Sequence, residues 1–185
     1  MSLKILHVIS GLEDGGAEAT LYNFITNSKN ESHIVISLKD EGKYGRIFEN
    51  NGIQVYYLNL SFNFSFIFKF FYLIKLIKRL NPNIVQTWMY HADFVGGCAS
   101  YIAKIKNIFW GIHHTSLDPC LNKRSTIMIA KINSILSYFI PKKIITCAEK
   151  AKEEHLNYGF DKNKFTVIQN GIDLKKFQKS NYKRS

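Results

Sequence analysis

The sequence predicts an α/β domain of the Rossmann-like kind, a mostly parallel sheet with helices on both faces. Short apolar runs typical of buried strands alternate with helical patterns along the chain, and such units are joined by right-handed crossovers. The 185 residues are 46% hydrophobic and 14% aromatic, which suits one sizeable core and argues against disorder. Gly52, Pro82 and Gly159 follow helical patterns and Pro141 precedes a strand, so the punctuation agrees with this division.

The expected elements alternate in chain order. The strands cover Leu3–Ile9, His33–Leu38, Ile53–Leu58, Asn83–Trp88, Asn107–Ile112, Lys143–Cys147 and Lys164–Ile168. The helices between them cover Ala17–Thr26, Gly45–Asn50, Phe64–Leu80, Ala92–Lys104, Lys123–Phe139 and Ala148–Asn157.

The most informative stretch joins the first strand to the first helix. A mainly apolar run, Leu3–Ile9, is followed by a loop with paired glycines, Gly15 and Gly16, and then by apolar residues at helical spacing. This order places the first amides of a helix at the carboxyl edge of the sheet, unscreened by bulky side chains. Such a corner attracts phosphate, because unpaired N–H groups and the helix dipole both favour an anion. The alternative is that both are turn glycines with positive φ.

The glycine spacing argues against two common nucleotide-binding motifs. A dinucleotide fingerprint needs Gly-x-Gly-x-x-Gly and an acid near the end of the second strand. Here the glycines are Gly11, Gly15 and Gly16, and Asp40 has no fingerprint to support it. The P-loop pattern Gly-x-x-x-x-Gly-Lys-Ser/Thr does not occur either.

Ligands of such sheets bind outside the carboxyl ends of the strands, and polar residues concentrate in two of the expected loops there. One loop holds His91 and Asp93, and the other holds His113, His114 and Asp118. Neighbouring histidines rarely aim at one ion, so a metal site is not expected.

The net charge of +11 does not identify a partner. One basic cluster is the tail from Lys175 to Ser185, and no nucleic-acid motif accompanies it. Nucleic acid is therefore not expected, although a basic Rossmann-like nucleic-acid binder stays a rival. Cys98, Cys120 and Cys147 lie far apart and are interpreted as reduced thiols of a cytoplasmic protein. The start of the chain predicts no signal peptide.

A second basic cluster lies in the aromatic-rich segment Phe62–Leu80. It comprises Lys69, Lys75, Lys78 and Arg79. The apolar arc of this segment is wider than one sheet face requires, and its lysines make it a poor spanning segment. Two interpretations stay open: a peripheral contact with an anionic membrane surface, or a helix wedged between the sheet and neighbouring helices.

Four stretches, in order, resemble one known family. They are Gly15–Glu18, Asn81–Trp88 with its continuation His91–Asp93, Trp110–Thr115, and Val167–Asp173 followed by Phe177. Together they resemble the N-terminal domain of retaining GT-B-fold glycosyltransferases, the group 1 type related to glycogen synthases and bacterial polysaccharide transferases. The resemblance covers nearly the whole chain.

The resemblance implies a function. Residues 1–174 would form the acceptor-side Rossmann-like domain, and residues 175–185 a cut end or the start of an interdomain linker. Family members carry a second Rossmann-like domain that binds most of the nucleotide-sugar donor, and without it this chain is expected to be inactive. The implied reaction moves a hexosyl group to a glycan or lipid-linked sugar in bacterial surface glycan synthesis (lipopolysaccharide, capsule or lipid-linked oligosaccharide). No metal or cofactor is expected, and the implied location is cytoplasmic, with peripheral contact to the inner face of the plasma membrane.

The resemblance also implies roles for single residues. The amide of Gly16, beside Gly15, would face the donor diphosphate. Glu18 is a weaker candidate, because the helix dipole favours an acid in the first turn regardless of ligand. His113 matches the family's active-site histidine, with His114 as the adjacent register. His91, Asp93 and Asp118 are acceptor-cleft candidates, and Asn170, Gly171 and Asp173 fall at the interdomain hinge.

Two further functions remain open at this point. One is an inverting GT-B transferase, in which a base such as His113 deprotonates the acceptor. The other is a non-catalytic subunit that partners a separately encoded glycosyltransferase domain.

Overall fold

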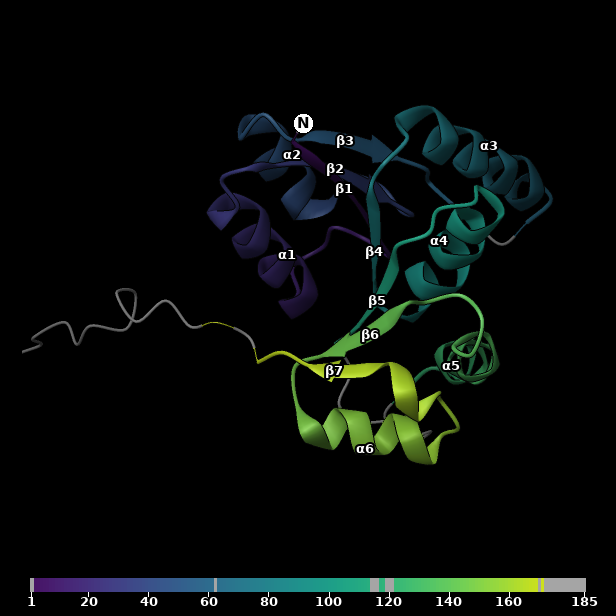
Figure 1. The fold of residues 1–185 in the computed structure, drawn as a ribbon. Coiled ribbons are helices and arrows are strands. Elements are labelled where there is room, and N and C mark those ends of the chain that lie inside the picture. The colour runs from purple at the N-terminus through teal and green to yellow at the C-terminus, as the bar shows by residue number, and fades with distance from the viewer. Residues whose placement is uncertain (1, 62, 114–116, 119–121, 170, 172–185) are drawn as a thin grey trace, which may run out of the picture.

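In the computed structural model, which describes residues 2–61, 63–113, 117–118, 122–169 and 171, the chain forms a seven-stranded parallel sheet in the order β3-β2-β1-β4-β5-β6-β7 (Figure 1). The strands are β1 (Leu3–Ile9), β2 (Glu31–Ser37), β3 (Gln54–Tyr57), β4 (Ile84–Trp88), β5 (Ile108–Ile112), β6 (Lys143–Thr146) and β7 (Phe165–Val167). The α-helices are α1 (Gly16–Asn27), α2 (Gly42–Asn50), α3 (Ser65–Leu80), α4 (Tyr90–Ile102), α5 (Arg124–Leu136) and α6 (Glu149–Asn157), and η1 (Lys162–Lys164) is a 3-10 helix.

Helices cover both faces of this sheet, as the sequence predicts. Successive strand residues point to opposite faces, so Leu6 and Val8 of β1 pack in one cluster with α3 and α4. Ile9, on the opposite face, packs in another cluster with residues of α1 and α2, such as Leu21 and Phe48. In Figure 1, α1 and α2 lie on one side of the sheet, while α3, α4 and α5 lie on the other.

The strand order reverses between β1 and β4. The chain runs outward from β1 to β3, then crosses back through α3 to place β4 against the free side of β1. In sheets of this kind the crevice at such a reversal is where ligands bind. The loops after β1, β4 and β5 are therefore the neighbours that frame this crevice, because β1, β4 and β5 are consecutive in the sheet.

Helix α4 begins earlier than the sequence predicts. The expected start is Ala92, but the helix runs from Tyr90, so His91 lies in its first turn, together with Asp93, and not in a loop. Met89 has a φ of 71°, and this left-handed residue turns the chain from β4 into the helix within one position. The Ser10 hydroxyl then accepts a hydrogen bond of 3.1 Å from the Ala92 amide, which supports the new helix start from the β1 loop.

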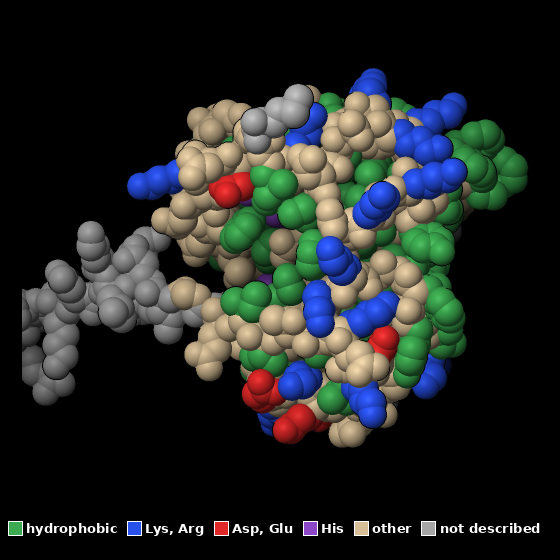
Figure 2. All heavy atoms as spheres, viewed as in Figure 1, with side chains coloured by type: hydrophobic (Ala, Val, Ile, Leu, Met, Phe, Trp, Pro, Cys, Tyr) green, Lys and Arg blue, Asp and Glu red, His purple; other side chains and the backbone are tan. Residues whose placement is uncertain are grey.

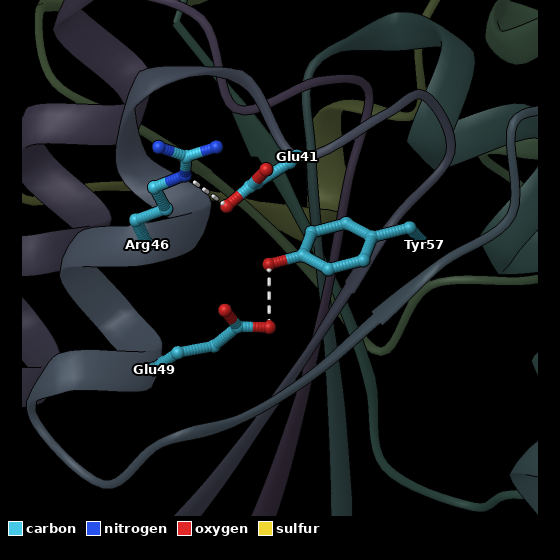
Figure 3. A network of polar contacts seen from close by, with 4 residues as sticks. All are labelled: Glu41, Arg46, Glu49 and Tyr57. Atoms are coloured by element: carbon cyan, nitrogen blue, oxygen red, sulfur yellow. Dashed lines mark hydrogen bonds and ion pairs between the residues drawn. The ribbon is translucent and has the colours of Figure 1, made fainter.

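A polar network ties α2 to β3 (Figure 3). The Tyr57 hydroxyl donates to the Glu49 carboxylate at 2.9 Å, and Arg46 Nε donates to the Glu41 carboxylate at 2.8 Å. Burial raises the pKa of Tyr57, and the neighbouring Glu49 acts in the same direction, so the phenol stays a donor. The Tyr57–Glu49 hydrogen bond therefore joins β3 to α2, while the Arg46–Glu41 pair lies at the start of α2 itself.

Candidate functional site

The glycine corner lies where β1 passes into α1. Gly15 is the residue before the helix, with an extended φ of −153°, and Gly16 is the first helical residue. Neither glycine has the positive φ that the alternative interpretation requires. A Cβ added at Gly16 would meet nothing within 4 Å. Among the described residues, neither packing nor backbone conformation therefore requires a glycine at position 16.

Gly15 has a close neighbour, whereas Gly16 has none. A Cβ at Gly15 would meet the carboxyl group of Glu18, the far end of a flexible side chain that would have to move. Glu18 is buried, and this burial raises the pKa of its carboxyl, with Glu13 and Asp14 adding to the effect. The corner thus contains an acid that gains a proton more easily than an ordinary glutamate does.

The loop after β2 holds the glycine corner in place. Gly42 has a φ of +53°, and a Cβ there would collide with the Leu12 carbonyl, so this glycine is required by the fold. The Tyr44 amide donates to the same carbonyl at 2.9 Å, and Lys43 pairs with Asp14 at 2.8 Å. The glycine corner is therefore fastened to α2 on one side.

His113 directly follows β5 and stacks on Trp88 at the end of β4. The ring centroids are 5.0 Å apart and the planes differ by 9°. Trp88 is buried while His113 is partly exposed. The Met89 amide donates to the Gly111 carbonyl at 3.0 Å, which joins the two strand ends. The tertiary structure thus places His113 at the carboxyl edge that the sequence predicts for it.

A groove of about 780 Å³ runs from this edge along the sheet face beside α1. His113 and Trp88 line it from the strand ends, Phe24 and Asn23 from α1, and Gly171 from the segment after β7. Histidine side chains are visible in the recess between α1 and β7 in Figure 2. The structure therefore brings His113 and Gly171 to one groove, although they are 58 positions apart in the sequence.

Asp93 is not the loop acid that the sequence analysis expects. Its carboxyl is fully buried in α4 and accepts a hydrogen bond of 2.5 Å from the Thr87 hydroxyl. Burial raises its pKa well above the ordinary range, although the hydrogen bonds from Thr87 and the Gly111 backbone act against this. The expected contact of Asp93 with an acceptor hydroxyl is wrong for this structure, because the carboxyl has no exposed surface.

The remaining predicted residues are scattered. His91 is partly buried in α4, and Asp118 is exposed after β5, where its carbonyl accepts from the Asn122 amide at 3.1 Å. Neither residue lines the groove. Three other predictions, His114, Asn170 and Asp173, and the tail 175–185 lie outside the described residues. Within the described residues, no group of three or more His, Cys, Asp or Glu side chains could hold a metal ion.

Two buried histidines lie beneath α1, and the sequence patterns did not single them out. His7 of β1 and His33 of β2 lie on the sheet face that carries the groove, and their rings are hydrogen-bonded to each other. The signal was present in the sequence, since a histidine inside an apolar strand run needs a polar partner when it is buried. The identity of that partner could not be read from the sequence.

Helix α3 is packed on one face and exposed on the other. Leu73, Ile74, Leu76 and Ile77 are buried. Phe68 and Phe71 are 67% and 59% exposed, and Phe64, the residue before the helix, is 86% exposed. In the first half of α3, Phe66 and Phe70 pack against the core, while the opposite face is left open to solvent. Lys69 donates to the Asn59 carbonyl, while Lys75, Lys78 and Arg79 are exposed.

Figure 2 shows basic side chains gathering over α3 next to hydrophobic ones. Among the helices that the structure describes, none combines the length and the apolar character needed to cross a bilayer.

The fold and the position of the site define a Rossmann-like domain of the GT-B class. The chain belongs to Glycosyltransferase Family 4, whose family model matches residues 14–176. The resemblance to the N-terminal domain of group 1 GT-B-fold glycosyltransferases is thereby confirmed.

Two relatives in sequence carry names that specify a function. The chain is 28% identical to the capsular polysaccharide biosynthesis glycosyltransferase CapH of Staphylococcus aureus, over 98% of this chain and 50% of CapH. It is 29% identical to the N,N'-diacetylbacillosaminyl-diphospho-undecaprenol alpha-1,3-N-acetylgalactosaminyltransferase of Campylobacter jejuni, over 87% of this chain and 46% of that protein. The chain spans about half the length of the curated relatives it matches.

Solved structures share the fold at low sequence identity. Anabaena HepE in complex with UDP-glucose superimposes with a TM-score of 0.79 at 18% identity, over 97% of this chain and 47% of that one. The lipopolysaccharide outer core galactosyltransferase WaaB gives a TM-score of 0.64 at 17% identity, over 92% of this chain and 46% of WaaB. At these identities the likeness establishes the fold alone.

Proposed function

We propose that this chain is the acceptor-side domain of a retaining, nucleotide-sugar-dependent glycosyltransferase that acts in bacterial surface glycan synthesis. The observation that carries the proposal is that the unobstructed amide corner at Gly16 and the partly exposed His113 lie along one edge, at the strand-order reversal. Family membership and the names of the two relatives support the same activity. Retention of configuration rests on the motif resemblance.

The chemistry of this edge suits transfer from a diphosphate. The α1 N-terminus at Gly16 offers backbone N–H groups and a positive dipole end to an anion, so it can stabilise charge that develops on a leaving nucleoside diphosphate. An imidazole such as His113 can donate a hydrogen bond to a hydroxyl of the transferred sugar. Neither the N–H groups at Gly16 nor the His113 imidazole requires a metal ion for these roles, and we propose that the reaction needs none.

Donor and acceptor are proposed from the relatives. HepE was solved with UDP-glucose, which supports a nucleoside diphosphate sugar as donor. The name of the Campylobacter relative specifies a diphospho-undecaprenol-linked sugar, which supports a lipid-linked sugar as acceptor. Since the relatives are about twice as long, we propose that a second Rossmann-like domain supplies most of the donor contacts. Residues 1–174 then form the acceptor-side domain, and residues 175–185 lead into the linker. Sequencing the reading frame beyond Ser185 tests this directly.

The decisive experiment replaces His113 in the protein as its natural reading frame encodes it. His113→Ala is expected to lower sugar transfer from UDP-glucose or a related donor by about a hundredfold or more, with the far-UV spectrum unchanged. Lys106→Ala, an exposed site away from the groove, is the matched control. Full activity of His113→Ala together with loss of activity in His114→Ala would move the role to His114.

The rival functions separate by simple measurements. Analysis of the product anomer distinguishes a retaining from an inverting transferase. Absence of transfer by the whole protein, combined with tight binding to a separately encoded transferase subunit, would favour the non-catalytic alternative. Strongly salt-dependent oligonucleotide binding that survives removal of residues 175–185 would favour a nucleic-acid binder.

We further propose that α3 contacts an anionic membrane from the cytoplasmic side. Its exposed Phe64, Phe68 and Phe71 offer apolar area, and the exposed Lys75, Lys78 and Arg79 offer complementary charge. Flotation with phosphatidylglycerol vesicles is expected to fall sharply when these three basic residues become Gln. Neutralising Lys29, Lys150 and Lys162 instead removes the same charge elsewhere and should leave flotation nearly intact. Equal flotation of both triple variants would reject the proposal.

A further inference from the structure

A pair of histidines lies buried under α1, and the proposed chemistry does not use it. His7 has no exposed surface and His33 is 8% exposed. Their rings lie 5.3 Å apart, inclined by 19°, and His7 Nε2 is 3.0 Å from His33 Nδ1. The ring of Phe24 from α1 packs edge-on against both, at 5.7 Å from each. Such a pair is costly to bury unless its hydrogen bonds are used.

The direction of these hydrogen bonds is fixed by Trp88. Trp88 Nε1 is 3.2 Å from His7 Nδ1, and an indole N–H can only donate. His7 Nδ1 is therefore the acceptor, and a neutral His7 carries its proton on Nε2, from which it donates to His33 Nδ1. Burial lowers the pKa of His7 to about 3, with the nearby His33 acting in the same direction, so His7 is neutral at physiological pH.

The same Trp88 ring also stacks on the imidazole of His113. Its indole N–H faces the buried His7, while its face stacks on the His113 imidazole with planes only 9° apart. The hydrogen bond to His7 removes the freedom of the indole to rotate in its pocket. The plane of the indole in turn sets the plane of the imidazole stacked on it.

We infer that His7 is a positioning residue: by accepting a hydrogen bond from the Trp88 indole N–H, it fixes the orientation of the indole ring on which His113 stacks at the carboxyl edge of the sheet. His33 supports this role because its Nδ1 accepts a hydrogen bond from the Nε2–H of His7 and so stabilises the tautomer whose Nδ1 is free to accept. Positioning groups behind a site residue hold it in productive geometry in this way. Only the expected effect of His7 on sugar transfer rests on the proposed function. The hydrogen bonds among Trp88, His7 and His33 do not depend on it.

Nuclear magnetic resonance tests the hydrogen-bond chain without any turnover. The chain has two tryptophans, and Trp110 Nε1 has no hydrogen-bond partner among the described residues, so its signal is an internal reference. The expected spectrum shows His7 as the Nε2–H tautomer at neutral pH and the Trp88 indole proton downfield of that of Trp110. His7→Phe should move the Trp88 indole signal upfield and shift the ring signals of His113. An Nδ1–H tautomer of His7, or unchanged His113 signals in His7→Phe, would overturn the inference.

A matched series separates positioning from a merely structural role. His7→Asn keeps an acceptor near the place of Nδ1 and should preserve the Trp88 and His113 signals, whereas His7→Phe should not. In a Trp88→Phe background, which retains a ring but has no indole donor, His7→Phe should produce almost no further change at His113. Additive changes in the double variant would show that His7 acts by another route and would reject the proposal.

The kinetic readout uses UDP release from UDP-glucose by the protein as naturally encoded. His7→Phe is expected to lower kcat by about tenfold to a hundredfold with a much smaller change in KM, and His7→Asn should restore most of kcat. A rise in KM alone would contradict positioning. Absence of UDP release from the unsubstituted protein would count against the proposed donor, whereas the spectra would still decide the role of His7.

Discussion

The hydroxyl of Thr87 donates a 2.5 Å hydrogen bond to the fully buried carboxyl of Asp93, and this bond joins the end of β4 to the first turn of α4. The joint lies directly beneath the site, because only Met89 separates the end of β4 at Trp88 from the helix that contains Asp93. Asp93, which the sequence suggested as a ligand-binding acid, is thus a structural residue that holds the end of β4 against α4.

The first prediction concerns the pH dependence of this support. Burial raises the pKa of Asp93 in the folded chain above its unfolded value, so the folded state retains its proton to higher pH than the unfolded state does. The free energy of unfolding therefore decreases as pH rises above the ordinary aspartate pKa of about 3.9. Asp93→Asn removes this contribution, and its stability relative to the natural chain should rise with pH. Urea unfolding at several pH values between about 4 and 8 measures the difference, and parallel curves for the two proteins would contradict it.

The second prediction contrasts two glycines of the same edge. Gly42→Ala should lower the free energy of unfolding by about 1 to 3 kcal/mol, because its φ is +53° and its Cβ would collide with Leu12. Gly16→Ala should change stability by less than about 1 kcal/mol, since its Cβ points into open space. Sugar transfer, in contrast, should fall in Gly16→Ala and further in Gly16→Val. An active and stable Gly16→Val variant would remove the diphosphate role.

The third prediction concerns His7. Its folded-state pKa of about 3 lies below the unfolded value of about 6.5. The unfolded chain therefore binds the proton first, and the stability that is fully present above pH 6.5 is lost as pH falls. This one group accounts for a loss of about 2 kcal/mol between pH 8 and pH 5. His7→Phe should show a correspondingly smaller loss in urea unfolding over that interval, and an unchanged loss would mean that His7 is protonated in the folded chain.

The fourth prediction concerns a buried contact between α4 and α6. His155 Nδ1 donates to the Ala151 carbonyl at 2.5 Å, so His155 Nε2 accepts from the Tyr90 hydroxyl, also at 2.5 Å. Tyr90→Phe removes this donor from the buried ring, and the free energy of unfolding should fall by about 1 to 3 kcal/mol. Tyr138 is 53% exposed, so Tyr138→Phe should change the free energy of unfolding by less than about 0.5 kcal/mol. Thermal or urea unfolding of both variants checks the contrast, and equal effects would refute it.

Much of the fold follows from local patterns. The bounds of β1, Leu3–Ile9, match the expected strand, and the alternation of strand and helix signals leads to a parallel sheet covered on both faces. The general position of the site follows too. Parallel strands end at one edge, so Gly16 after β1 and His113 after β5 had to lie along it.

Other features depend on contacts between distant parts of the chain. His91 looks like a loop residue because no local signal indicates the turn at Met89. The burial of Asp93 depends on its contact with Thr87 of β4. The apolar residues of α3 surround much of the helix, so the sequence does not show which of them are buried. The packing of α3 beside α4 decides which face meets solvent.

The amino-acid sequence by itself determined the fold class, the family resemblance and the edge of the sheet at which ligands are expected, because these depend on periodicity and on motifs of a few neighbouring residues. The tertiary structure decided which side chains support that edge. His7 and Trp88 are 81 positions apart, and they touch because β4 pairs with β1 after the chain crosses back over the sheet. Strand order and register create such contacts, and neither is encoded in a local pattern.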